Sequence, residues 1–341
     1  MKAKWESGSF FHLDVSAFAG ESWLPASHQL YGSGRDALKA LVVHGVSLGW
    51  KRLFVPSYYC HEVTESVRAL ISIELYHCNF QSDCMSLSLK DHDAIIVVEY
   101  FGRRSVVEVT GGVLILDVTH DPCSGWPYER SPDYIFASLR KTCLLPDGGI
   151  LWSPVGELLP SAPSVTVAHA RLSELMLNAM TLKAIYLSGG RIEKPVFLDM
   201  YRRAEADCGQ GECPSAISIF SNELLPCFDM KRMRQVRAEN SRFLRDRLQG
   251  VLHDIEIVES DAYFIMLLKN ADQRNYFRDR LIEKSIFPIA LWPLGGDEIS
   301  QEDSVLSERV LMLHCDARYT LKDMKMIAEA IQQMMDSLHE C

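Results

Sequence analysis

The sequence lacks the features that mark membrane, secreted and nucleic-acid-binding proteins. Its 341 residues carry a net charge of −10, whereas phosphate binding needs clustered lysine and arginine. The first twenty residues contain charges where a signal peptide needs a continuous apolar core, and no apolar run is long enough to cross a bilayer. These absences predict a cytoplasmic protein whose partners include neither a membrane nor a nucleic acid.

Paired cysteines are also missing. The ten cysteines are scattered, without a CxxC pair or the regular spacing of a disulfide framework, so they are interpreted as reduced thiols. Residues 60–62 (CHE) are of metal-ligating types, but they lack a distant second pair of ligands. The sequence therefore predicts no metal site.

The sequence does contain short apolar strands that alternate with helices between residues 32 and 154. This alternation is typical of a largely parallel sheet covered on both faces, and such sheets bind ligands at the carboxyl ends of their strands. An amphipathic helix is predicted over 229–250, followed by a smaller α+β pattern. The predicted strands cover 51–56, 72–78, 93–101, 111–120, 132–139, 148–154, 262–269 and 309–316.

Glycines open the first predicted helix, in the stretch GSGRDAL at 32–38. Gly34 allows a close backbone approach, Ser33 offers a hydroxyl, and the amides of Gly34, Arg35 and Asp36 present N–H groups to an anion. A glycine before a helix is also an ordinary cap, so this stretch alone leaves both interpretations open.

Three more candidate residues follow predicted strands. Tyr59 is either a ring that covers a bound heterocycle or a half-buried aromatic residue. Asp117 ends a very apolar strand, where a carboxylate needs a positive partner such as a protonated pyridine nitrogen, unless it anchors a loop. Lys141 precedes a glycine pair by seven residues, and its amine attacks carbonyls only when its pKa is lowered. Lys141 by itself is equally compatible with a surface charge.

Together these residues indicate one cofactor. Pyridoxal phosphate needs a lysine for its aldehyde, an acid at its pyridine nitrogen, an anion cradle and a residue that covers its ring. Lys141, Asp117 and Tyr59 meet three of these needs, and residues 33–36 with Ser138 meet the fourth. The convergence predicts a pyridoxal-phosphate site.

These stretches give the chain a family resemblance. It resembles the fold-type I pyridoxal-phosphate enzymes, and most of all the sugar-aminotransferase (DegT/DnrJ/StrS-like) branch. GSGRDAL is similar to the family's SGTxAL loop, VPSYYCHEV to TPFTFVAT, LILDVTHDPCSG to IEDAAQAHG, and SLRKTCLLPDGG to SFxxxKxxxxGEGG. Two positions depart from the pattern: Ser138 precedes Lys141 by three residues where sugar enzymes have five, and His120 replaces a glutamine.

The resemblance implies an aspartate-aminotransferase-like fold. This fold has a large three-layer α/β/α domain with a mostly parallel sheet and a small C-terminal α+β domain. The expected division is an N-terminal arm at 1–30, a cofactor-binding domain at 31–195, and an interdomain helix with the small domain at 196–341. The resemblance also implies a homodimer with its active site at the interface.

The resemblance implies roles for individual residues. Lys141 takes the position of the Schiff-base lysine, Asp117 lies at the pyridine nitrogen, Tyr59 covers the ring, and His120 contacts its phenolic oxygen or edge. The residues expected at the phosphate are Ser33, Gly34, Arg35 and Ser138. Arg318 either binds a substrate carboxylate or forms a surface ion pair.

The expected reaction is amino transfer through a Lys141 aldimine, from an amino-acid donor to a small keto or aldehyde acceptor. A keto sugar or another biosynthetic intermediate is among the acceptors that the resemblance allows. The same cofactor also supports a lyase, a cyclase or a β/γ-replacement enzyme acting on an amino acid. A non-catalytic binding protein on this fold is a third interpretation, against which the presence of both Asp117 and Lys141 argues.

Overall fold

The computed structural model describes residues 3–14, 22–124, 129–295 and 298–339. The larger of its two compact units comprises residues 11–186 and 190–229, and the smaller comprises the chain up to Phe10, Leu187–Gly189 and the chain from Met230. The predicted boundary at 195/196 differs from this division, because the helix over Lys194–Asp207 belongs to the larger unit. Part of the predicted arm, residues 15–21, lies outside the described residues.

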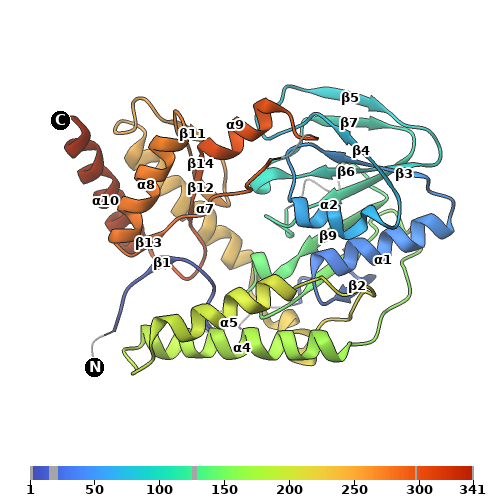
Figure 1. The fold of residues 1–341 in the computed structure, drawn as a ribbon, viewed down its shortest axis with the longest axis horizontal. Helices are drawn as coiled ribbons and strands as arrows, with labels where there is room; N and C mark the ends of the chain where they lie inside the picture. Colours follow the sequence, from blue (N-terminus) through green and yellow to red (C-terminus); the bar gives the residue numbers. More distant parts are fainter. Residues whose placement is uncertain (1–2, 15–21, 125–128, 296–297, 340–341) are drawn as a thin grey trace. The chain divides into compact units, whose positions relative to one another are not determined.

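Seven strands form the sheet of the larger unit, in the order β2-β10-β9-β8-β6-β3-β4 (Figure 1). Neighbouring strands are parallel except at β10, which runs antiparallel to both β2 and β9. The strands are β2 His28–Tyr31, β3 Arg52–Pro56, β4 Ser72–Tyr76, β6 Asp93–Val98, β8 Val113–Asp117, β9 Tyr134–Ser138 and β10 Gly149–Trp152. The mostly parallel sheet expected from the sequence is confirmed.

Burial along the strands explains which of them the sequence could reveal. β6 and β10 are buried at every position, as is required of strands covered on both faces. β2 has no apolar run, because His28 and Gln29 occupy half of it, and the sequence did not predict it. Its pairing with β10, where Tyr31 lies opposite Gly149, holds it in the sheet. A separate parallel pair, β5 Met85–Ser88 with β7 Val107–Thr110, also escaped prediction.

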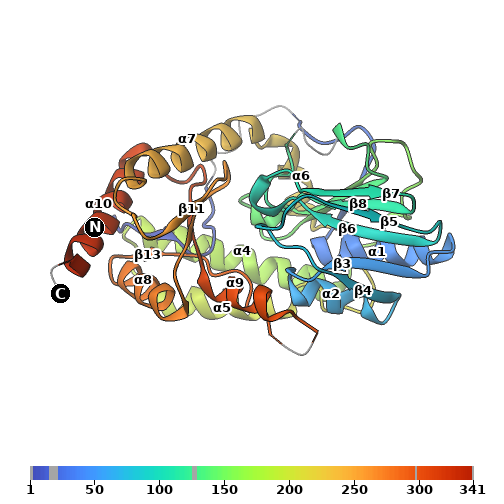
Figure 2. The ribbon, with the colours of Figure 1, turned by 90° about the horizontal axis from the view of Figure 1, so that it is seen from above.

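Helix α1, Gly34–Ser47, packs on β9 and β10 (Figure 1). The Ser33 hydroxyl caps it by accepting the Asp36 N–H at 3.1 Å, which satisfies one of the orphan donors of the first turn. The other described helices that lie wholly or mostly in this unit are α2 His61–Arg68, α4 Val167–Leu187, α5 Lys194–Asp207 and α6 Ile219–Leu224, with short 3-10 turns η2 Tyr100–Gly102, η3 Leu139–Lys141 and η4 Leu225–Cys227. Figures 1 and 2 show α4 and α5 side by side, where the Tyr186 and Phe197 ring centroids are 5.3 Å apart.

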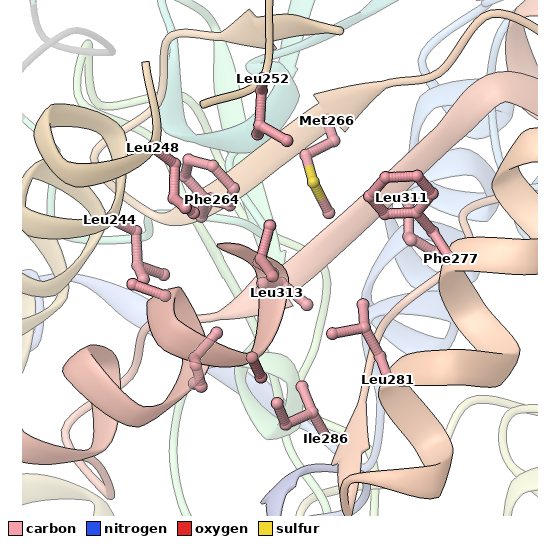
Figure 3. Packing of buried hydrophobic residues seen from close by; sticks show 14 of the residues in the cluster. Leu244, Leu248, Leu252, Phe264, Met266, Phe277, Leu281, Ile286, Leu311 and Leu313 are labelled. Atoms are coloured by element: carbon pink, nitrogen blue, oxygen red, sulfur yellow. The ribbon is translucent and has the colours of Figure 1, made fainter. Parts of the chain in front are cut away.

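The smaller unit has an antiparallel sheet, β11-β12-β14, and a short parallel pair, β1 with β13. Its core joins Leu248, Phe264, Phe277 and Leu313, each at most 1% exposed (Figure 3). Its elements are β1 Ser7–Gly8, α7 Met230–Leu248, β11 Glu256–Val258, β12 Tyr263–Leu267, α8 Ala271–Glu283, β13 Ile286–Phe287, α9 Gln301–Arg309, β14 Val310–His314 and α10 Leu321–His339. The α+β pattern predicted here is confirmed, although β11 and α9 were not foreseen. Across the described ranges, no helix has the length and apolar character needed to cross a membrane.

Candidate functional site

Parallel strands β8 and β9 bring two of the predicted site residues to the same edge of the sheet. Asp117 is the last residue of β8 and Ser138 the last of β9. Thr119 joins them: its N–H donates to Asp117 Oδ1 at 2.9 Å, and its hydroxyl oxygen accepts the Ser138 N–H at 3.0 Å. The sequence interpretation did not assign a role to Thr119, although an aspartate at a strand end is itself a turn signal, because its side chain can accept the backbone N–H two residues on.

Asp117 is a buried carboxyl group whose partners are all neutral. It is 6% exposed, and its Oδ2 accepts a 2.5 Å hydrogen bond from the Tyr59 hydroxyl. Burial raises the pKa of Asp117, and the bonds from Thr119 and Tyr59 only partly oppose this rise. No cation pairs with this carboxylate among the described residues. Such a group would gain stability from a positive partner at the strand end.

Tyr59 contributes its hydroxyl to the site, whereas the sequence interpretation used only its ring. The residue is 4% exposed and its hydroxyl donates to Asp117. Burial first, and then the neighbouring Asp117, raise the pKa of Tyr59 well above its ordinary value, so the phenol stays protonated and remains a donor. Tyr59 is therefore a hydrogen-bond partner of the buried acid in this structure.

His120 contacts the turn that follows β6. Its Nδ1 accepts the backbone N–H of Phe101 at 3.1 Å, and the two rings stack with centroids 5.4 Å apart. Phe101 has a φ of +57°, a left-handed conformation that costs energy for a bulky residue. His120 thus supports the strained turn after β6, and its expected contact with a cofactor ring stays a prediction.

The start of α1 lies directly beside Ser138. A Cβ atom on Gly34 would come within 2.9 Å of the Ser138 Cβ, and one on Gly149 within 2.1 Å of the Ser33 carbonyl oxygen. Both glycines are therefore needed for three segments to meet at one point. In the glycine pair of SLRKTCLLPDGG, Gly149 is required by this close approach. Gly148 is required because its φ of +134° is a conformation that other residues rarely adopt.

At the predicted anion cradle, Ser33 caps its own helix. Its hydroxyl accepts the Asp36 N–H and donates to Asp36 Oδ2 at 2.7 Å in this structure, and its role at a phosphate stays a prediction. In contrast, the Arg35 guanidinium and the Ser138 hydroxyl have no hydrogen-bond partner in the described part of the chain. They lie at the N-terminus of α1, where the helix dipole favours an anion.

Lys141 closes the short turn η3 beside these residues. Its side chain is 49% exposed, and its Nζ lies 4.0 Å from Oε2 of Glu205. The charge of the adjacent Arg140, followed by burial, lowers the pKa of Lys141, while Glu205 opposes this. Because half of the side chain contacts solvent, screening tempers the effect of Arg140. The direction is the one that a nucleophilic amine requires.

Arg318 belongs to the smaller unit and is fully engaged there. Its side chain is 1% exposed, and Nε and Nη2 donate to the two Asp316 oxygens at 2.7 and 2.9 Å. Nη1 donates to the carbonyl of Phe10 at 3.2 Å. The guanidinium that a substrate carboxylate would use is thus occupied in this structure. This favours the ion-pair alternative for Arg318, here as a buried pair, and a substrate contact stays a prediction.

Glu205 is the site residue that sequence reasoning missed most completely. It forms a bidentate ion pair with Arg140, with Nη2 to Oε2 at 2.9 Å. Its distance from Arg140 along the chain is 65 residues, so no local pattern connects the two. Among the residues that the structure describes, no group of histidine, cysteine, aspartate and glutamate side chains could hold a metal ion.

No protein-family model matches the chain, and no curated protein matches its sequence. Solved structures do match. The chain is similar to a putative sugar aminotransferase, Spr1654 from Streptococcus pneumoniae, with a TM-score of 0.59 and 16% identity over 91% of this chain and 88% of that one. Two more are a DegT DnrJ EryC1 StrS aminotransferase from Brucella abortus (TM-score 0.53, 13% identity, 90% and 86% covered) and the sugar aminotransferase CalS13 from Micromonospora echinospora (TM-score 0.54, 13% identity, 90% and 87% covered). At these identities the likeness establishes the fold, and the predicted fold class is confirmed.

Proposed function

We propose that the protein is a pyridoxal-phosphate-dependent aminotransferase. The observation that carries the proposal is the arrangement of Lys141, Asp117 and the start of α1 around one edge of the sheet, in a chain that shares the fold of the sugar aminotransferases. Spr1654, which has this fold, has been solved in a PLP form and a PMP form. These cofactor forms belong to that protein, and the shared fold supports the same cofactor here.

The residues present fit this cofactor. A ring with a protonated nitrogen would supply the positive partner that the buried Asp117 carboxylate lacks among its neutral donors. A phosphate could accept hydrogen bonds from the Arg35 guanidinium, the Ser138 hydroxyl and the N–H groups at the N-terminus of α1. An aldehyde would find the half-exposed amine of Lys141, whose pKa is lowered. When bound, pyridoxal phosphate supplies an electron sink for the carbanion that forms during amino transfer.

The residues of this chain would divide the work as follows. Lys141 would bind the cofactor covalently through its amine, and the freed amine would carry a proton between the reacting carbon of the substrate and the C4′ carbon of the cofactor. Asp117, held by Tyr59 and Thr119, keeps the ring nitrogen protonated. Arg35, Ser138 and the backbone of Gly34 hold the phosphate end. The acceptor is a small ketone or aldehyde, with a keto sugar as one candidate, and the homodimer expected from the resemblance stays a prediction.

Reconstitution tests the cofactor. Purified protein mixed with pyridoxal phosphate should develop a visible absorption band that borohydride removes, and peptide mapping should find the reduced cofactor on Lys141. Lys141→Ala should abolish the labelled peptide, while Lys51→Ala, at another exposed lysine, should leave it unchanged. Protein with Lys141 intact that takes up no pyridoxal phosphate would contradict the proposal.

A single-turnover experiment tests the reaction. Incubation of the loaded enzyme with an amino-acid donor and no acceptor should produce one equivalent of the matching keto acid and no free ammonia. Release of ammonia, or a new bond at the β or γ carbon, would instead identify a lyase or a replacement enzyme. Uptake of the cofactor without either product would identify a binding protein.

A further inference from the structure

The end of α5 and the loop that follows it contact both halves of the proposed site. Glu205, near the end of α5, pairs with Arg140 and approaches Lys141. Four residues later, Gly209 has a φ of +64° and lies so near the start of α1 that a Cβ there would be 2.9 Å from the Arg35 Cβ. The segment from Glu205 to Gly209 therefore connects the lysine with the anion cradle.

Glu205 lies between two cations on consecutive residues. It contacts the Arg140 guanidinium with both carboxylate oxygens, a geometry that fixes the plane of the guanidinium as well as its distance. The Oε2 atom that accepts from Arg140 Nη2 also lies 4.0 Å from Lys141 Nζ. The Arg140 side chain is 10% exposed and that of Glu205 is 27% exposed, so solvent screens this pair less than a surface pair.

We propose that Glu205 is a positioning residue, which holds the Arg140 guanidinium beside Lys141 and sets how much net positive charge the lysine amine experiences. Its importance for amino transfer rests on the proposed function, but the arrangement itself belongs to the ligand-free chain. The carboxylate also opposes the lowering of the Lys141 pKa that Arg140 causes. Glu205, together with Arg140, burial and the neighbouring thiols of Cys208 and Cys60, thus adjusts the fraction of Lys141 amine that is free to react.

Charge and shape can be separated at this position. Glu205→Gln keeps the size of the side chain and removes its charge, so both cations lose their counter-charge and the pKa of Lys141 should fall by about 1. Glu205→Asp restores the charge on a shorter stem and should recover most of the wild-type value. Arg140→Gln removes the neighbouring positive charge that lowers the pKa of Lys141, so this pKa should rise instead.

The measurement is made on protein without cofactor. Lysines are reductively methylated with 13C-formaldehyde, and the signal of Lys141, identified by its absence in Lys141→Arg, is titrated by NMR. Asp199→Asn is the matched control, because it removes one charge from the same helix at a residue that is 64% exposed and, among the described residues, pairs only with Arg203 at 3.8 Å. That control should leave the pKa of Lys141 unchanged.

Three results would overturn the proposal. They are a Glu205→Gln titration equal to wild type, a shift of the same size in Asp199→Asn, and a fall of the Lys141 pKa in Arg140→Gln. If Glu205→Gln fails to fold, the aspartate and Arg140→Gln titrations decide. This titration is made without cofactor, so a negative result would contradict the role of Glu205 and not the aminotransferase proposal. Conversely, a protein that binds no pyridoxal phosphate would contradict the aminotransferase proposal, and the titration would still test the role of Glu205.

Discussion

The hydrogen bond from Tyr59 to Asp117 makes a prediction that needs no ligand. Tyr59→Phe keeps the buried ring and removes the donor 2.5 Å from Asp117 Oδ2. When Asp117 is ionised, a lost bond to a charged group costs about 2 kcal/mol of unfolding free energy, and when it is protonated the lost neutral bond costs about 1 kcal/mol. The difference of about 1 kcal/mol corresponds to a rise of about 0.7 in the pKa of Asp117 in the variant.

The sign of the pH dependence follows from the raised pKa. Burial raises the pKa of Asp117 above its value in the unfolded chain, so the folded protein binds the extra proton and stability falls as pH rises between the two values. Removal of the Tyr59 hydroxyl raises the folded pKa further and widens this window. The destabilisation by Tyr59→Phe should therefore grow with pH and level off once Asp117 is ionised in both proteins.

Urea unfolding at a series of pH values measures this effect. Tyr134→Phe is the matched control, because Tyr134 is 2% exposed in the same unit and its hydroxyl donates to the neutral carbonyl of Leu158 at 3.3 Å. Its cost should be about 1 kcal/mol and independent of pH. A Tyr59→Phe cost that is equally flat with pH would refute the role of the Tyr59 hydroxyl in holding a titrating carboxylate.

Two further variants test the contacts around the anion cradle. Gly34→Ala places a Cβ atom 2.9 Å from the Ser138 Cβ, so it should lower the free energy of unfolding in urea by about 1–3 kcal/mol and weaken pyridoxal-phosphate binding. Gly250→Ala is the control, because no atom lies near the added Cβ, and its free energy of unfolding should stay within about 0.5 kcal/mol of wild type. Lys39→Met removes two bonds, to the carbonyls of Gly209 at 2.8 Å and Gly211 at 2.7 Å, so it should cost about 2 kcal/mol and speed amide exchange in residues 208–211. Unchanged exchange there would argue against this anchoring role of Lys39.

Residue type and strand position made much of the site predictable. An acid at the end of an apolar strand, a lysine before a glycine pair and a glycine-flanked helix start are local features, and each lies at the sheet edge as expected. Side-chain direction was not predictable in the same way. His120 turns to the strained turn at Phe101, a backbone partner 19 residues away that the linear sequence does not display. Ser33 caps its own helix through Asp36, three residues on, which is a local signal that competes with the expected contact with an anion.

The amino-acid sequence by itself determined the mostly parallel sheet, the positions of its apolar strands along the chain and the residues that follow them, because hydrophobic periodicity and strand-end chemistry are local properties. Only the tertiary structure decided the partners of those residues. Tyr59 reaches Asp117 across 58 residues and Glu205 reaches Arg140 across 65. Such contacts depend on how the strands and helices pack, and this packing sets the burial and the neighbouring charges that move the pKa values of Asp117 and Lys141.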